Sequence, residues 1–236
     1  MQLRKCSLSQ KKFRDELGLF IAEGEKMVEE AMKSGYHIEN VYHSRDIGAE
    51  AMSRISSLSS PSPVLAVIRK PSDIYLDDLS SLEDMLSSGG LYLALDTIRD
   101  PGNLGTILRI ADWFGIDAVF AAKDTVDVFN PKVVQATMGA ILRVRVHYTN
   151  LAKWLENQHD TKIYGTFLEG ENIYSAQLDK SGVIVMGNEG QGISAEVAAT
   201  VSHKLLIPPY PADRCGSESL NVAVATAVIC SEFRRR

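Results

Sequence analysis

The chain has 236 residues, of which 45% are apolar and 23% are charged, and these proportions are ordinary for a folded globular protein. The length suits one large domain or two smaller ones. No apolar run approaches the ~20 residues of a membrane helix, and the N-terminus lacks the apolar segment of a secretory signal, so we expect a cytoplasmic protein. The net charge of −5 argues against a protein that coats nucleic acid, because phosphate neutralisation supplies most non-specific affinity.

Cysteine and histidine give no sign of a metal site. The cysteines Cys6, Cys215 and Cys230 are odd in number and lack metal-ligand spacing, which predicts free thiols in a reducing compartment. The histidines are scattered along the chain. We therefore expect neither a metal nor a membrane among the partners of this protein.

Basic side chains gather at both ends of the chain. Five of them precede the first acidic residue, Asp15: Arg4, Lys5, Lys11, Lys12 and Arg14. A solvated basic tail and a local RNA contact are both consistent with this run. The closing Arg234, Arg235 and Arg236 also suit the C-terminus of a helix.

The first 70 residues alternate between strand and helix patterns, which predicts a small α/β domain. We expect helices at 7–17, 25–33 and 48–58, with Ser7 or Ser9 as the first N-cap, and strands at 19–22, 38–43 and 64–68. Residues 71–90 form the predicted linker. Four leucines at helical spacing within it predict a short amphipathic helix: Leu76, Leu79, Leu82 and Leu86.

Residues 91–236 continue as a longer α/β series, which predicts a second domain. Strands are expected at 91–95, 118–121, 143–146, 163–167, 183–186 and 205–207. Helices are expected at 103–114, 131–139, 151–158, 194–201 and 220–233, with Ser194 capping the fourth. The run at 91–95 is apolar throughout, as a strand buried on both faces requires.

Three runs in this second domain follow an apolar strand pattern and precede a helical one: residues 96–105, 187–192 and 207–219. The second run has three glycines in six residues, which lets backbone approach a ligand closely and leaves N–H groups to bind it. A plain strand-to-helix turn is the alternative. The order of the glycines fits neither the dinucleotide fingerprint nor the phosphate-binding loop.

Together these runs resemble the SpoU-type RNA 2′-O-ribose methyltransferases of the SPOUT class. The first motif of that family is matched by Asn103, Gly105 and Arg109, and the second, a Gly-rich loop with a Glu, by residues 187–192 with Glu189. The third is matched by Ser219-Leu220-Asn221-Val222. The resemblance implies a parallel-sheet domain closed by a C-terminal trefoil knot, although knots are very rare among folds in general. The run FIAEGEKMVEEA is similar to the ribosomal-protein-like RNA-binding domain that precedes it in such enzymes.

The resemblance also implies the chemistry. The expected reaction is methyl transfer from S-adenosylmethionine to a ribose 2′-hydroxyl of RNA, with ribosomal RNA favoured over transfer RNA by the two-domain layout and with a homodimer as the active form. The implied cofactor-binding residues are Gly187, Ile207 and Leu220, with Thr166 as a neighbour. The implied catalytic residues are Arg109, Asn103, Glu189, Ser219 and Asn221.

Each catalytic candidate also has a simpler interpretation. Arg109 could be an ordinary exposed arginine on a helix, and Glu189 could be a solvated loop residue. The other three could be helix-capping residues: Asn103, Ser219 and Asn221. Because arginine stays protonated in proteins, we expect Arg109 to act as a clamp on phosphate or on the developing oxyanion, not as a base.

Two other functions stay open at this point: a non-catalytic RNA-binding module of the same fold, and a SPOUT enzyme that methylates a base nitrogen. One departure from the family pattern is visible. The bridge PPYPADRCGSE at 208–218 is longer and richer in proline than the family's loop, so the cofactor loop is expected to differ in shape.

Overall fold

The computed structural model describes residues 8–76, 89–211 and 219–235. Its chain forms two compact units. The first comprises residues up to 72 together with 127–143, and the second comprises 73–126 together with 144–236.

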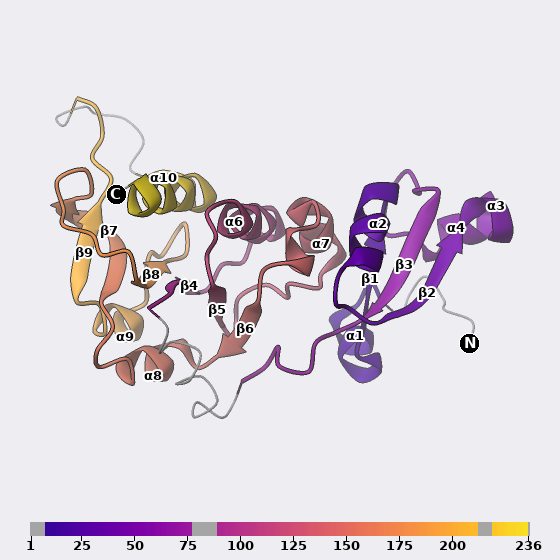
Figure 1. Ribbon diagram of the computed structural model, residues 1–236, viewed down its shortest axis with the longest axis horizontal. Coiled ribbons are helices and arrows are strands. Elements are labelled where there is room, and N and C mark those ends of the chain that lie inside the picture. Colours follow the sequence, from indigo (N-terminus) through magenta and orange to yellow (C-terminus); the bar gives the residue numbers. More distant parts are fainter. Residues whose placement is uncertain (1–7, 77–88, 212–218, 236) are drawn as a thin grey trace. The chain divides into compact units, whose positions relative to one another are not determined.

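The first unit is built on a three-stranded antiparallel sheet with the order β1-β3-β2. The strands are β1 (Leu19–Glu23), β2 (Ile38–His43) and β3 (Val64–Arg69), and β3 lies in the middle because it carries the most continuous apolar run. The helices of the N-terminal stretch are α1 (Lys11–Leu17), α2 (Glu25–Lys33), α3 (Ser44–Ile47) and α4 (Ala49–Ile55) (Figure 1). The predicted small α/β arrangement is therefore present.

A segment from far along the chain completes this first unit. Residues 127–143 contain α7 (Pro131–Thr137) and the short 3₁₀ helix η1 (Ala140–Leu142), and α7 packs on β1. The rings of Phe20 and Phe129 lie 4.6 Å apart, and the hydroxyl of Tyr36 donates to the carbonyl of Ile141 at 3.2 Å. The domain boundaries at 70 and 91 stay a prediction. The sequence-based division placed residues 127–143 in the second domain, not in the first.

The second unit contains a six-stranded sheet with the order β6-β5-β4-β8-β7-β9, in which every neighbouring pair is parallel. The predicted parallel-sheet domain is confirmed. Its strands are β4 (Leu91–Leu95), β5 (Ala118–Ala122), β6 (Val146–Thr149), β7 (Ile163–Asn172), β8 (Gly182–Met186) and β9 (His203–Leu206).

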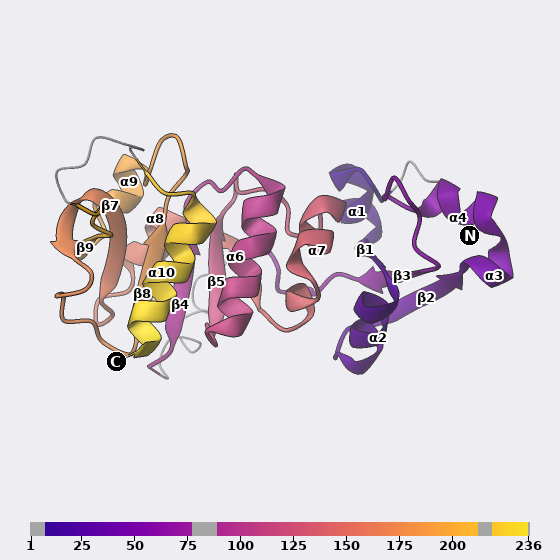
Figure 2. The same ribbon diagram turned by 90° about the horizontal axis from the view of Figure 1, so that it is seen from above.

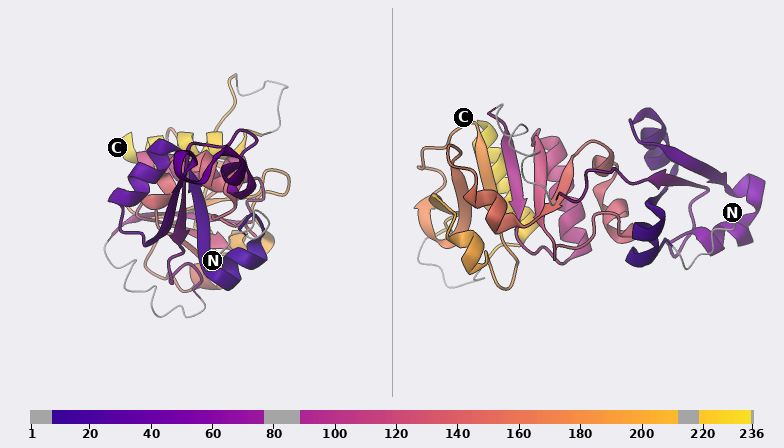
Figure 3. Two further views of the ribbon diagram at one scale, coloured as in Figure 1. Left: turned by 90° about the vertical axis from the view of Figure 1, so that its right-hand side faces the viewer. Right: turned by 90° about the horizontal axis from the view of Figure 1, so that it is seen from below.

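Helices cover both faces of this sheet. Helices α6 (Pro101–Trp113) and α10 (Val222–Arg235) lie side by side on one face (Figure 2), and α8 (Leu151–Glu156) and α9 (Ala195–Ala198) lie on the other (Figure 3). Every residue of β4, β5 and β8 is buried, which explains why these strands read as apolar runs without alternation. Under α8 the ring of Trp154 stacks on Phe120 at 4.0 Å.

Several local predictions were wrong for physical reasons. The alternating run at 143–146 is not a strand; Arg143 and Arg145 are solvent-exposed, and the buried strand β6 begins only at Val146. The helix predicted at 48–58 is present as α4 but ends earlier, at Ile55, and Gly48 with φ +82° separates it from α3. Helix α1 begins at Lys11 after Gln10, so Ser9 is not its cap.

Three predictions are not decided. The amphipathic linker helix and the Ser7 cap lie largely outside the described residues. Helix α10 follows the edge strand β9 in the chain yet lies beside α6, over the middle of the sheet (Figure 2). Whether the chain threads a loop on that path, as a trefoil knot requires, stays a prediction.

Among the described residues no helix is long and apolar enough to cross a bilayer.

Candidate active site

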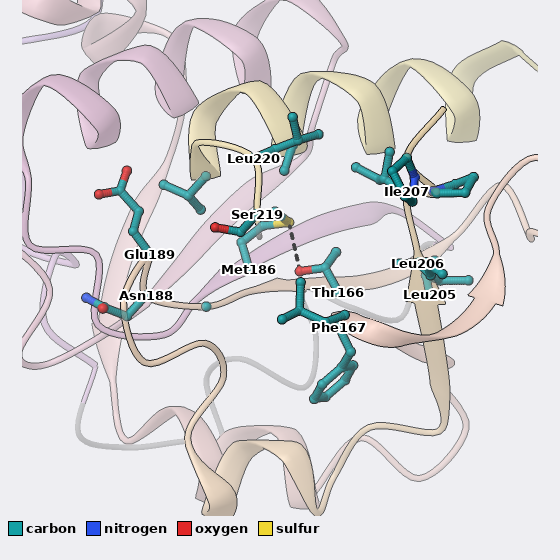
Figure 4. A pocket seen from close by; sticks show the side chains of 16 residues that line it. Thr166, Phe167, Met186, Asn188, Glu189, Leu205, Leu206, Ile207, Ser219 and Leu220 are labelled. Carbon is teal, nitrogen blue, oxygen red and sulfur yellow. Dashed lines mark hydrogen bonds between the residues drawn. The ribbon is translucent and has the colours of Figure 1, made fainter. Parts of the chain in front are cut away.

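The site lies at the edge of the sheet where β4, β8 and β9 end, beside residues 166–168 of β7. Because parallel strands have their carboxyl ends at one edge of the sheet, the loops that follow them meet there. A cavity of about 390 Å³ opens at this edge, within the ~300–1,000 Å³ typical of ligand pockets. Figure 4 shows Asn188 and Glu189 at one end of the cavity and Ile207 at the other.

Close backbone contact shapes the Gly-rich loop after β8. A Cβ atom at Gly187 would lie 2.4 Å from both the carbonyl carbon of Gly192 and the amide nitrogen of Ile193, so only glycine fits. Gly192 has φ +70°, a conformation that favours glycine. The amide groups of Gly190 and Gln191 donate to Asn188 and are not free for a ligand, contrary to the sequence-based expectation for this loop.

The structure brings the cofactor-binding candidates together. Thr166, Gly187, Ile207 and Leu220 all line the cavity, as do the catalytic candidates Glu189 and Ser219. The hydroxyl of Thr166 donates to the carbonyl of Val185 at 3.3 Å and lies 3.8 Å from the sulfur of Met186. The lining also contains residues that sequence reasoning missed: Phe167, Leu168, Met186, Pro208, Pro209, Val222 and Ala225. Phe167 and Leu168 follow the candidate Thr166 in the chain, and the others lie within or beside the second and third motifs.

Three catalytic candidates form one hydrogen-bonded cluster. Oε1 of Glu189 accepts hydrogen bonds from the side-chain amides of Asn103 and Asn221, the latter at 3.0 Å. Asn221 also donates to Oδ1 of Asn103 at 3.0 Å. These residues come from α6, from the Gly-rich loop and from the start of α10, so the cluster joins all three motifs.

The helix caps of the cluster contradict the simpler interpretation of Asn103 and agree with that of Asn221. Asp100, not Asn103, is the N-cap of α6, and its carboxylate accepts from the amide of Asn103 at 2.8 Å. Asn221 does cap α10, because its Oδ1 accepts from the amides of Ala223 and Val224. Asn221 therefore has both a capping bond and a bond to the cluster.

Arg109 is not part of this cluster. It is exposed on α6 and forms no hydrogen bond or ion pair with any residue that the structure describes. On a regular helix, six residues separate it from Asn103 by roughly 9 Å along the axis and about 120° around it. Within one chain, then, Arg109 faces away from Asn103 and is available to an external group.

The electrostatics of the cavity are simple. Glu189 is the one ionisable side chain among the described residues that line it. The thiol of Cys230 in α10 is no candidate nucleophile, because burial raises its pKa to about 12. No three His, Cys, Asp or Glu side chains in the described part of the chain gather as metal ligands.

Comparison with known proteins decides which family has this arrangement. A sequence profile of the SpoU rRNA Methylase family matches residues 90–231, which include the whole site. The chain belongs to this family. A profile of the MRM3-like substrate binding domain matches residues 4–70 of this SpoU-family chain.

Relatives of this SpoU-family chain cover nearly its whole length. The 23S rRNA (guanosine(2553)-2′-O)-methyltransferase RlmP of Bacillus subtilis (strain 168) is 30% identical over 245 residues, which cover 96% of this chain and 93% of the relative. The solved structure of a TrmH-family protein from Porphyromonas gingivalis has a TM-score of 0.83 and 37% identity, and covers 98% of this chain and 95% of that one. An AdoMet-bound rRNA methyltransferase from Sinorhizobium meliloti has a TM-score of 0.82 and 29% identity, with 97% and 92% covered.

Proposed function

We propose that this protein transfers a methyl group from S-adenosylmethionine to a ribose 2′-hydroxyl of ribosomal RNA. The observation that carries the proposal is the cavity at the ends of the strands, where the cofactor-binding candidates meet the Asn103–Glu189–Asn221 cluster. Membership of the SpoU family and the names of the relatives support the reaction and favour ribosomal over transfer RNA.

The cavity suits this cofactor chemically. Its walls are mostly apolar, as the flat base of an adenosine needs, and Gly187, Ile207 and Leu220 are among the residues that line it. When bound, S-adenosylmethionine supplies a reactive methyl group on a positively charged sulfur. The carboxylate of Glu189 places a negative charge at one end of the cavity, which favours a cationic centre there.

The hydrogen bonds divide the roles within the cluster. Asn221 uses both of its N–H groups and its carbonyl inside the chain, so we assign it a holding role. Oε2 of Glu189 and the second N–H of Asn103 have no partner among the described residues. We infer that these two groups hydrogen-bond the target ribose and hold its 2′-oxygen in line for methyl transfer.

Arg109 acts in this proposal as a clamp and not as a base, because guanidinium stays protonated. It stabilises the negative charge that develops on the 2′-oxygen, or binds the adjacent phosphate. Because Arg109 faces away from its own cluster, we propose that it serves the site of a second copy in a homodimer. Action in the cytoplasm and the absence of a metal requirement stay predictions.

The decisive experiment uses labelled S-adenosylmethionine and ribosomal RNA that lacks modifications, followed by alkaline hydrolysis of the product. A 2′-O-methyl group blocks cleavage at its own linkage, so we expect the label in alkali-resistant dinucleotides. Transfer RNA is the matched control substrate and should accept much less label.

Each other outcome points to a different function. Label in free mononucleotides would mean base methylation and would overturn the proposed chemistry. Strong labelling of transfer RNA alone would overturn the substrate. Measurable cofactor binding without transfer to either RNA would favour the non-catalytic binding module.

A further inference from the structure

One asparagine holds the Gly-rich loop together. Oδ1 of Asn188 accepts hydrogen bonds from the amides of Gly190 at 2.9 Å and Gln191 at 3.2 Å. Its backbone exchanges two further bonds with Gly192, at 2.9 and 2.8 Å. The loop is thus closed around the Asn188 side chain, with Glu189 next to it and solvent-exposed.

The same side chain fastens the loop to the neighbouring strand. Nδ2 of Asn188 donates to the carbonyl of Thr97 at 2.9 Å, just after β4. Thr97 has φ +62°, a strained conformation for a β-branched residue, which turns the chain directly after the strand.

A second hydrogen bond attaches the far end of the loop to the β4–α6 connection. The buried carboxylate of Asp96 accepts a hydrogen bond from the amide of Ser194 at 2.7 Å. Ser194 stands at the N-cap position of α9, as predicted, but its side chain makes no capping bond. The Gly-rich loop is therefore fixed to the β4–α6 connection on both sides of Glu189.

We propose that Asn188 is a positioning residue that aims Glu189 at Asn103 and Asn221, with Asp96 as the second anchor. The proposal rests on the proposed function for its catalytic consequence. Asn188 also lines the cavity, yet its three side-chain hydrogen bonds are all made within the chain, so its effect on the reaction passes through Glu189.

The first test measures amide hydrogen exchange and needs no activity. Asn188→Ala removes three side-chain hydrogen bonds, so exchange in peptides covering 187–194 and 219–224 should become at least several-fold faster. Asn188→Asp keeps the acceptor for Gly190 but loses the bond to Thr97. The exchange rate of its loop should therefore lie between those of the wild type and Asn188→Ala. Asn150→Ala is the matched control, because Asn150 caps α8 in the same unit without touching the cavity; exchange at the loop should not change.

The second test is a double-mutant cycle on kcat at saturating cofactor and RNA. Asn188→Ala should lower kcat about tenfold, since small misplacements of catalytic groups cost this much or more. In a Glu189→Ala background the same change should have almost no further effect, because Asn188 acts through Glu189.

Two results would overturn the positioning role: unchanged exchange of the loop in Asn188→Ala, or independent, multiplicative losses of kcat in the cycle. If the wild-type protein transfers no methyl group, the proposed function fails. The exchange measurement would then still decide whether Asn188 holds the loop and Glu189 in place.

Discussion

Glu189 is the side chain on which the three motifs converge. Its Oε1 accepts hydrogen bonds from amides that lie 86 residues before it and 32 residues after it in the chain. A carboxylate that accepts two side-chain amides fixes both of them more firmly than water would. At the residue scale, the site is therefore pre-organised before any substrate binds.

Arg109 gives the sharpest prediction at this scale. Arg109→Ala should lower kcat at least a hundredfold, because in the proposed mechanism this charged group stabilises the transition state. Affinity for the cofactor, measured by calorimetry, should stay within about threefold, since Arg109 does not line the cavity.

Arg145→Ala is the matched control for Arg109→Ala, because Arg145 is an exposed arginine of the same unit that lies outside the three motifs. Its kcat should equal that of the wild type. Unchanged turnover in Arg109→Ala would remove Arg109 from the mechanism.

At the scale of elements, α6 and α10 form a parallel pair that is joined at both ends. Asn103 and Asn221 bond at their N-terminal ends, and Arg234 of α10 donates to the carbonyls of Phe114 and Gly115 at the C-terminal end of α6. Cations near a helix C-terminus are favourable. Arg234 thus has a structural role at a helix C-terminus, in line with the sequence-based interpretation of the closing basic residues.

The first unit depends on a buried ion pair between α1 and the segment 127–143. Arg14 and Asp127 are 1% and 7% exposed, and two guanidinium nitrogens donate to one carboxylate oxygen at 3.1 and 2.6 Å. Arg14 also donates to the carbonyls of Leu8 and Ser9. This pair fixes α1 to a segment that lies more than 100 residues away in the chain.

Arg14→Met should therefore destabilise the protein by about 3–5 kcal/mol, because it leaves a buried carboxylate unpaired. Urea unfolding followed by circular dichroism measures the change. The control is Lys12→Met, which breaks only the exposed pair with Glu16 and should cost less than about 1 kcal/mol. Equal stability of the two variants would show that the pair does not hold the unit together.

At the scale of the whole molecule, the proposed homodimer needs a surface. Helices α6 and α10 and the residues just before α10 expose large apolar side chains to solvent: Trp113 at 86%, Val224 at 51% and Leu220 at 50%. Exposed apolar groups on neighbouring helices are typical of an interface. Val222 and Ile229 of α10 are buried within the chain, whereas Val224 is exposed.

We expect the wild-type protein to sediment with the mass of two chains at micromolar concentration. The double variant Trp113→Glu with Val224→Glu should shift it toward the mass of one, because two carboxylates would be buried at the interface. Tyr174→Glu changes an aromatic side chain that is 53% exposed and lies outside these helices, and it should leave the mass unchanged. A wild-type protein that sediments as a single chain would contradict the dimer.

The amino-acid sequence by itself determined the order of strands and helices in the second unit, its parallel sheet and the positions of the three motifs. Local patterns suffice for this, because burial on both faces leaves unbroken apolar runs such as 91–95 and 183–186. Where a local pattern competed with burial, as at Arg143 and Arg145, the prediction failed. The tertiary structure alone decided that Asn103, Glu189 and Asn221 touch. That contact depends on β4 lying beside β8 and on α10 returning to α6, and long-range pairings of this kind leave no periodicity in the chain. For the same reason no local pattern revealed that residues 127–143 complete the first unit or that Asn188 fastens the Gly-rich loop to Thr97.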